Sequence, residues 1–114
     1  MPVPSPRVYL LHIRDCCERL REWPALRERG AAPNYILLDA VCRNLEIIGE
    51  ASRKIGSDYR AAHPQIPWRE MNDIRNVLIH NYEGADAGMV WGIVDREIPQ
   101  VLEAVRGLLT ESPK

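Results

Sequence analysis

Apolar residues recur at alternating three- and four-residue intervals along the last part of the chain. They fall at Trp91, Val94, Ile98, Val101, Val105 and Leu108. This spacing keeps returning to one stripe of an α-helix, so these residues can pack along a single seam of an antiparallel bundle. Pro99 lies inside the stretch and predicts a bend, because proline cannot donate a backbone hydrogen bond and its ring crowds the preceding turn.

Helical periodicity also organises the earlier part of the chain. Ser5 and Pro6 form a favourable helix start, and Pro24 is expected to end or kink that helix. No alternation of apolar and polar residues is long enough to predict a sheet. The fold is therefore predicted to be all-α, an up-and-down antiparallel bundle of four to five helices with the last one bent at Pro99. The earlier helices are expected over about 6–22, 34–55, 57–62 and 67–80.

Length and composition set limits on the architecture and on the partners. The chain has 114 residues, which is enough for one core, so we expect a single domain over 1–110 and a loose tail over 111–114. No apolar run approaches the roughly 20 residues of a membrane span, and no secretory signal is evident, so a cytoplasmic protein is expected. The net charge of −1 provides no global attraction to a polyanion, and any contact with nucleic acid must be local.

The chain shows no evident set of metal ligands and no cofactor motif. The three cysteines, Cys16, Cys17 and Cys42, contain no C-x-x-C pair and are expected to be reduced thiols that pack in the bundle. His12 and Cys16 have the i, i+4 spacing of a helical zinc pair, but a third and a fourth ligand are not evident. There is no Walker loop and no dinucleotide-binding fingerprint. We therefore expect no metal and no cofactor.

The stretch 74–82 concentrates the chemistry of the chain. It contains Arg75, Asn76, His80, Asn81 and Tyr82. The arginine fork matches a phosphate bidentately, and histidine titrates near the working pH. Together they suffice to hold a phosphodiester and to move the proton of an attacking or leaving oxygen without a metal.

Helical geometry restricts how these side chains can meet. Arg75 and Tyr82 are two turns apart on one stripe, about 10 Å along the axis, whereas His80 lies about 140° around the helix from Arg75. The pair can reach one phosphate if the helix end loosens or if a second protomer completes the site. A homodimer with two facing Arg75/His80 sets is the corresponding prediction.

The motif Arg75-x-x-x-x-His80-x-Tyr82 resembles the R-x-x-x-x-H-x-Y signature of HepT-like toxins, a branch of the HEPN ribonuclease superfamily. The resemblance extends over most of the chain after Pro33. It includes the blocks 43–51, 63–68 and 90–99, in the order found in the family.

This resemblance implies an activity and a partner. It implies a HEPN-like bundle acting as a metal-independent endoribonuclease toxin of a type II/VII-like toxin–antitoxin pair. Arg75 would clamp the scissile phosphate of RNA, His80 would act as general base or acid, and Asn76 would position one of them. It also implies that an MNT-type minimal nucleotidyltransferase antitoxin transfers AMP from ATP onto Tyr82.

Several alternatives remain open at this point. Arg43, Glu46 and Glu50 share a face of the second helix, either as a solvated stripe or, with Asn81, as supporting residues of the cleft. Tyr82 could simply pack in the bundle. The whole domain could be a catalytically silent helical module that binds a nucleotide or a partner nucleotidyltransferase, because fold does not guarantee activity.

Overall fold

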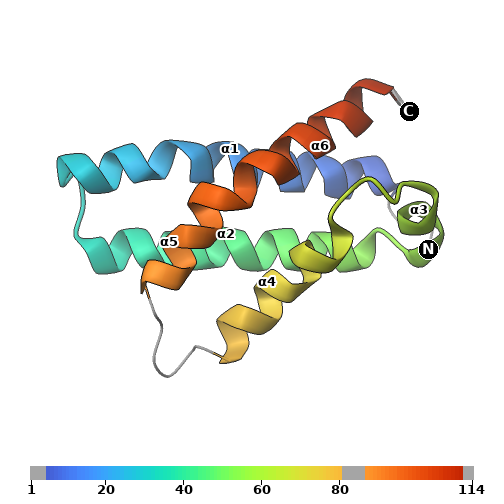
Figure 1. The fold of residues 1–114 in the computed structure, drawn as a ribbon. Coiled ribbons are helices and arrows are strands. Elements are labelled where there is room, and N and C mark those ends of the chain that lie inside the picture. Colours follow the sequence, from blue (N-terminus) through green and yellow to red (C-terminus); the bar gives the residue numbers. More distant parts are fainter. Residues whose placement is uncertain (1–4, 81–86, 112–114) are drawn as a thin grey trace.

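The computed structural model describes residues 5–80 and 87–111, and they form helices connected by short turns (Figure 1). No strand occurs within these two ranges. The helices are α1 (Pro6–Arg29), α2 (Asn34–Lys54), α3 (Ser57–Ala62), α4 (Trp68–His80), α5 (Ala87–Arg96) and α6 (Ile98–Glu111). Counted as one bent helix, α5 and α6 bring the number within the range predicted from the sequence, and the all-α prediction is confirmed.

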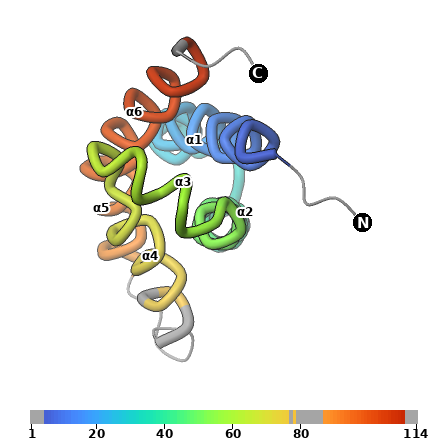
Figure 2. The backbone as a smooth tube through the Cα atoms, turned by 90° about the vertical axis from the view of Figure 1, so that its right-hand side faces the viewer, coloured from blue at the N-terminus to red at the C-terminus, as the bar shows by residue number. Residues whose placement is uncertain are grey.

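The helices form two layers. Helices α1 and α2 run antiparallel as one long hairpin, and α4, α5 and α6 form a second layer that packs across it (Figures 1 and 2). Within this second layer α4 contacts α2, whereas α6 contacts α1. Gly30 closes α1 in the left-handed conformation with φ 65°, and its N–H donates to the Arg27 carbonyl at 3.1 Å. No described helix is both long enough and apolar enough to cross a membrane.

Helix α1 is longer than the sequence predicted. Pro24 lies inside it, and the helix continues to Arg29 instead of ending near residue 22. Pro24 cannot donate to the carbonyl one turn earlier, which is a local cost. Trp23 and Leu26 on either side of it are partly buried against the core, so packing outweighs that cost.

The bend between α5 and α6 is where the sequence placed it. The helical pattern is interrupted at Glu97, two residues before Pro99. Pro99 cannot donate to the carbonyl of Asp95, whereas the bonds from Glu97 N–H to Ile93 O (2.9 Å) and from Val101 N–H to Glu97 O (3.1 Å) carry the chain through the bend. All six residues of the predicted seam are buried.

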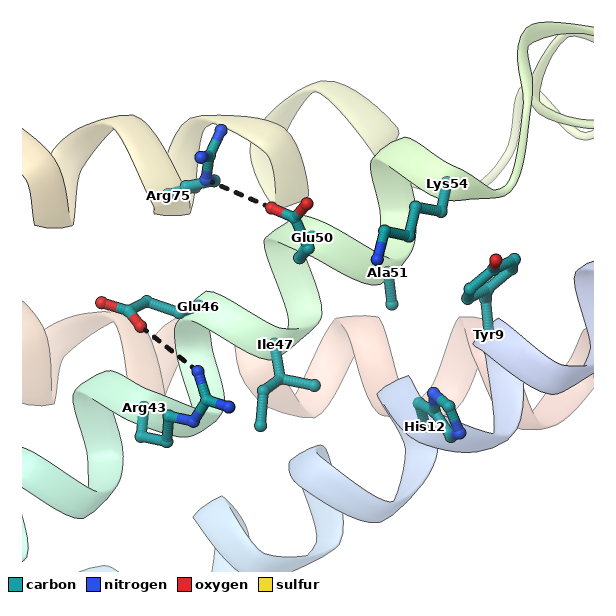
Figure 3. Close-up of a pocket in the computed structure, with 9 residues that line it drawn as sticks. All are labelled: Tyr9, His12, Arg43, Glu46, Ile47, Glu50, Ala51, Lys54 and Arg75. Carbon is teal, nitrogen blue, oxygen red and sulfur yellow. Dashed lines mark ion pairs between the residues drawn. The ribbon is translucent and has the colours of Figure 1, made fainter.

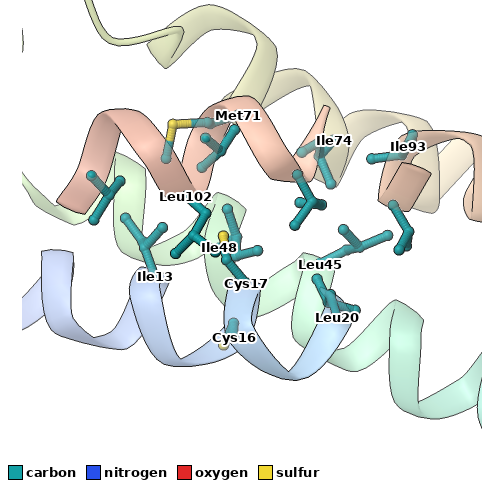
Figure 4. Close-up of a cluster of buried hydrophobic side chains, with 14 of the residues drawn as sticks. Ile13, Cys16, Cys17, Leu20, Leu45, Ile48, Met71, Ile74, Ile93 and Leu102 are labelled. Carbon is teal, nitrogen blue, oxygen red and sulfur yellow. The ribbon is translucent and has the colours of Figure 1, made fainter. Parts of the chain in front are cut away.

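One apolar core lies between the two layers (Figure 4). Ile13 and Leu20 of α1, Leu45 and Ile48 of α2, and Met71 of α4 have no exposed surface. Trp68 and Trp91 are also buried, as their place in the apolar rhythm predicted, and the Trp68 indole donates to the His63 carbonyl at 2.9 Å.

The cysteines pack within or beside this core as free thiols. Cys16 and Cys17 of α1 are buried, and Cys42 of α2 is partly buried. Burial raises the pKa of the Cys17 thiol from 9.0 to about 12. Burial likewise raises the pKa of Cys16, even though the Arg19 guanidinium nearby favours the thiolate. These two groups are therefore packing residues in their thiol form.

Candidate functional site

A groove of about 490 Å³ is lined by residues of α1, α2 and α4 (Figure 3). Its sides mix cations, carboxylates and aromatic rings above an apolar strip. The lining residues are Tyr9 and His12 from α1, Arg43, Glu46, Ile47, Glu50, Ala51 and Lys54 from α2, and Arg75 from α4. Four site residues predicted from the sequence therefore lie in this one groove. They are Arg43, Glu46 and Glu50 of α2 and Arg75 of α4.

Arg75 lies at the α4 side of the groove and forms an ion pair with Glu50. The Arg75 Nε and Glu50 Oε2 atoms are 3.4 Å apart, and the side chains are 36% and 43% exposed. A pair this exposed contributes little to stability. Its effect is to orient the guanidinium, whose two outer nitrogens point away from Glu50 (Figure 3).

A glycine allows α4 to lie close to α2 at this point. A Cβ atom at Gly49 would lie 3.0 Å from the Cβ of Arg75 and 3.4 Å from the carbonyl oxygen of Met71. Any larger residue would push Arg75 outward. Gly49 is thus a positioning residue for Arg75, a role that the sequence analysis did not assign.

A buried hydroxyl strengthens the same helix contact. Ser52 has no exposed surface, and its Oγ lies 2.9 Å from the Gly49 carbonyl oxygen and 3.0 Å from Oδ1 of Asn72 on α4. The hydroxyl can donate to either oxygen. Because the Asn72 bond joins the two helices one turn from Arg75, it restricts sliding of α4 along α2.

Arg43 and Glu46 occupy the opposite end of the groove from Lys54. Their ion pair measures 3.8 Å between Arg43 Nη1 and Glu46 Oε2 and lies within α2. Both are more exposed than the Arg75 pair. The face shared by Arg43, Glu46 and Glu50 is therefore part of the groove, but only Glu50 contacts α4 through an ion pair among the described residues.

The α1 side of the groove carries two residues that the sequence analysis did not place in a site. Tyr9 and His12 are three residues apart on α1, and their rings meet edge to face with centroids 6.4 Å apart. His12 entered the sequence analysis only as a possible zinc ligand with Cys16. Cys16 is instead buried in the core, and no cluster of three His, Cys, Asp or Glu side chains that could hold a metal occurs among the described residues.

The rest of the motif is only partly described. Asn76 is exposed on α4, next to Arg75. His80 is the last residue of α4, but its side chain lies outside the described part of the structure. Asn81 and Tyr82 also lie outside it.

A family model matches most of this chain. The model is described as ribonuclease HepT-like, and it matches residues 13–108, which include α2, α4 and the whole Arg75-to-His80 segment. The chain belongs to the HepT-like ribonuclease family. The resemblance seen in the motif is thereby confirmed.

HepT-like relatives cover the chain to different extents. A candidate RNase of Caldanaerobacter subterraneus is 36% identical over 110 residues, which are 92% of this chain and 95% of the relative. A protein named probable ribonuclease HepT, from Thermococcus cleftensis, is 52% identical over 62 residues, 54% of this chain and 56% of the relative.

A third relative is a longer protein. It comes from Methanocaldococcus jannaschii, is named as a gamma-glutamylcyclotransferase and candidate RNase, and is 34% identical over 109 residues. The match covers 95% of this chain but 49% of the relative, so the chain spans about half of that protein. No solved structure matches this chain with significance.

Proposed function

We propose that this HepT-like chain is an endoribonuclease that cleaves RNA without a metal ion. The observation that carries the proposal is the placement of Arg75. Its backbone is drawn against α2 at Gly49, and its guanidinium is oriented by Glu50 at the rim of a groove. An arginine that is partly exposed, oriented by an ion pair and located at the rim of a groove is suited to binding a substrate phosphate.

The proposed chemistry is internal transfer at the phosphodiester. His80 accepts the proton of the RNA 2′-OH as this oxygen attacks phosphorus, and the bond from phosphorus to the 5′-oxygen breaks. The leaving 5′-oxygen takes up a proton from water, His80 afterwards returns its proton to the solvent, and the products are a 2′,3′-cyclic phosphate and a 5′-hydroxyl. Arg75 stabilises the charge that develops on the phosphate oxygens, and Asn76 positions the side chain of either Arg75 or His80.

The active form in this proposal is a homodimer. His80 lies about 140° around α4 from Arg75 on an ideal helix, so one α4 does not direct both side chains at one phosphate. A two-fold interface brings a second copy of each group into the same cleft, where Arg43, Glu46, Glu50 and Asn81 act as supporting residues. Light scattering at micromolar concentration is expected to give twice the monomer mass, and a monomer would contradict this part of the proposal.

The proposed biological role is that of a toxin neutralised by a minimal nucleotidyltransferase. This partner transfers AMP from ATP to the Tyr82 hydroxyl and releases pyrophosphate. The AMP group adds a negatively charged phosphodiester and a purine two residues from His80. Its phosphate therefore competes with the substrate phosphate for Arg75. Mass spectrometry after co-expression with such a transferase is expected to show AMP-sized additions that disappear in Tyr82→Phe.

The deciding experiment for the nuclease is an RNA cleavage assay with total RNA, in the presence and absence of a chelator. Cleavage should persist in chelator and should fall by about 10²–10⁴-fold in His80→Ala, the usual contribution of a general acid or base. Arg75→Ala should lose a similar factor. Arg69→Ala is the matched control, because Arg69 is exposed on the same helix and does not line the groove.

Expression in a host cell separates the nuclease from a silent helical module. The unmodified chain should arrest growth, whereas the His80→Ala variant should not. Absence of both cleavage and growth arrest would instead favour a catalytically silent helical module that binds a nucleotide or a partner nucleotidyltransferase.

A further inference from the structure

The groove extends beyond Arg75 to two aromatic side chains on α1, and this second end has no role in the proposed cleavage. Tyr9 and His12 stand across the groove from Arg75 (Figure 3). Both precede the residues matched by the HepT-like family model, so membership of the family assigns them nothing. We propose that this end binds one base of a single-stranded RNA, next to the phosphate that Arg75 holds. The inference rests on the proposed ribonuclease function.

The shape and the lining of the groove suit a nucleotide. Its volume of about 490 Å³ falls within the usual range for small-molecule sites. Ile47 and Ala51 of α2 point into it between the Arg75 side and the α1 side and form an apolar strip (Figure 3). A planar base placed on this strip would meet the rings of Tyr9 and His12 at its edge, and single-stranded RNA is commonly held by stacking on such rings.

The charges of the groove suit a polynucleotide backbone. Arg43 is paired with Glu46 and Arg75 with Glu50, whereas Lys54 has no ion pair among the described residues. The Lys54 amino group extends along the groove between Glu50 and Tyr9 (Figure 3). Lys54 near the aromatic end and Arg75 on the α4 side are therefore two cations of one groove that phosphates of the same strand can contact.

A binding measurement tests the subsite independently of cleavage. The probe is a short single-stranded 2′-O-methyl oligoribonucleotide with a fluorescent end, which cannot be cleaved by 2′-OH attack. Tyr9→Leu, His12→Ala and Lys54→Ala should each weaken its binding by about tenfold, as loss of a stacking or phosphate contact does. Leucine at position 9 keeps the apolar packing of this partly buried residue.

Two matched controls lie on the same protein. Tyr35 is an exposed aromatic residue at the N-terminal end of α2, whereas Lys54 is at the C-terminal end. Arg53 is an exposed cation next to Lys54 that does not line the groove. Tyr35→Ala and Arg53→Ala should bind the probe within about twofold of the unaltered protein, because neither side chain lines the groove. Circular dichroism verifies that every variant is folded.

Photocrosslinking provides a readout that needs no variant. A probe carrying a single 4-thiouridine is irradiated with the unaltered protein, and trypsin then cuts after Arg7 and Arg14. The crosslinked base should appear on the peptide Val8–Arg14, which contains both Tyr9 and His12. Crosslinks elsewhere only, or equal binding by the groove variants and the controls, would overturn the subsite.

The outcomes distinguish the subsite from the nuclease. If RNA is cleaved but the α1 variants bind normally, the ribonuclease stands and the subsite is wrong. If the probe crosslinks to Val8–Arg14 but RNA is not cleaved, the groove binds RNA and the nuclease proposal fails. Absence of any probe binding, as expected if a second copy of the chain fills the groove, overturns the subsite.

Discussion

Helix α2 packs against two neighbours in different ways. Toward α1 it presents large apolar side chains, and residues such as Leu45 and Ile48 meet Ile13 and Leu20 in a fully buried layer (Figure 4). Toward α4 the contact around Arg75 depends on a glycine, a buried hydroxyl and an ion pair at the surface. The contact with α1 stabilises the bundle by burying apolar surface, and the contact with α4 around Arg75 determines where α4 lies.

This difference separates stability from placement of the site. Burial of apolar area is large and non-directional, so it tolerates small shifts of one helix on another. A glycine contact and a hydrogen bond between helices contribute less free energy but specify a distance. Changes at the α1 contact should therefore alter stability, and changes at the α4 contact should alter activity.

Ile48→Ala should have the largest effect on stability. Removing these methyl and methylene groups from the core should lower the free energy of unfolding by about 2–5 kcal/mol, measured by urea denaturation. Ile36→Ala is the matched control, since Ile36 is exposed on the same helix and should change stability by less than about 1 kcal/mol. Equal losses in the two variants would contradict the burial argument.

The free energy of unfolding should decrease above pH 9 because the Cys17 thiol on α1 is buried in the core. Burial raises the Cys17 pKa from 9.0 to about 12, so between these values the unfolded chain releases this proton and the folded chain retains it. Fewer protons on the unfolded state mean that stability falls as pH rises, by about 1.4 kcal/mol per pH unit for this thiol. The free energy of unfolding, measured by urea denaturation at several pH values in this range, should depend less steeply on pH in Cys17→Ala. The same dependence on pH in both proteins would contradict the burial of the thiol.

Gly49→Ala should affect cleavage more than stability. The new Cβ would lie 3.0 Å from the Arg75 Cβ, so α4 must move by a few tenths of an ångström, which should lower the cleavage rate by on the order of tenfold. The gain in helix propensity of up to about 1 kcal/mol offsets the crowding. Gly107→Ala in α6 is the matched control, because nothing lies near its Cβ position, so stability should rise slightly with normal cleavage.

Glu50→Gln should have the smallest effect. The ion pair with Arg75 is partly exposed, so its loss should change the free energy of unfolding by less than about 1 kcal/mol. The guanidinium loses its orientation, and RNA cleavage should slow a few-fold. Glu70→Gln should leave cleavage unchanged, because Glu70 is an exposed residue in the first turn of α4 and does not line the groove. A Glu50 variant indistinguishable from this control would remove the orienting role.

Much of the fold was predictable because helix formation and burial follow local periodicity. The seam from Trp91 to Leu108 and the bend at Pro99 could be identified from spacing alone. Pro24 misled the prediction, since a proline has a known local cost, whereas the packing of Trp23 and Leu26 that outweighs it comes from elsewhere in the bundle. Arg43, Glu46 and Glu50 all line the groove, and their i, i+3, i+7 spacing on one helix predicts that they share a face.

By itself, the sequence determined where most of the helices lie, which of their faces are apolar, and which stretch carries an arginine and a histidine at fixed spacing. Only the tertiary structure decided that Arg75 faces Glu50 across a glycine contact, and that Tyr9 and His12 complete the same groove. The physical reason is that periodicity specifies the direction of a side chain around its own helix axis. It carries no information on which other helix lies in that direction, because the neighbour is selected by packing of the whole core.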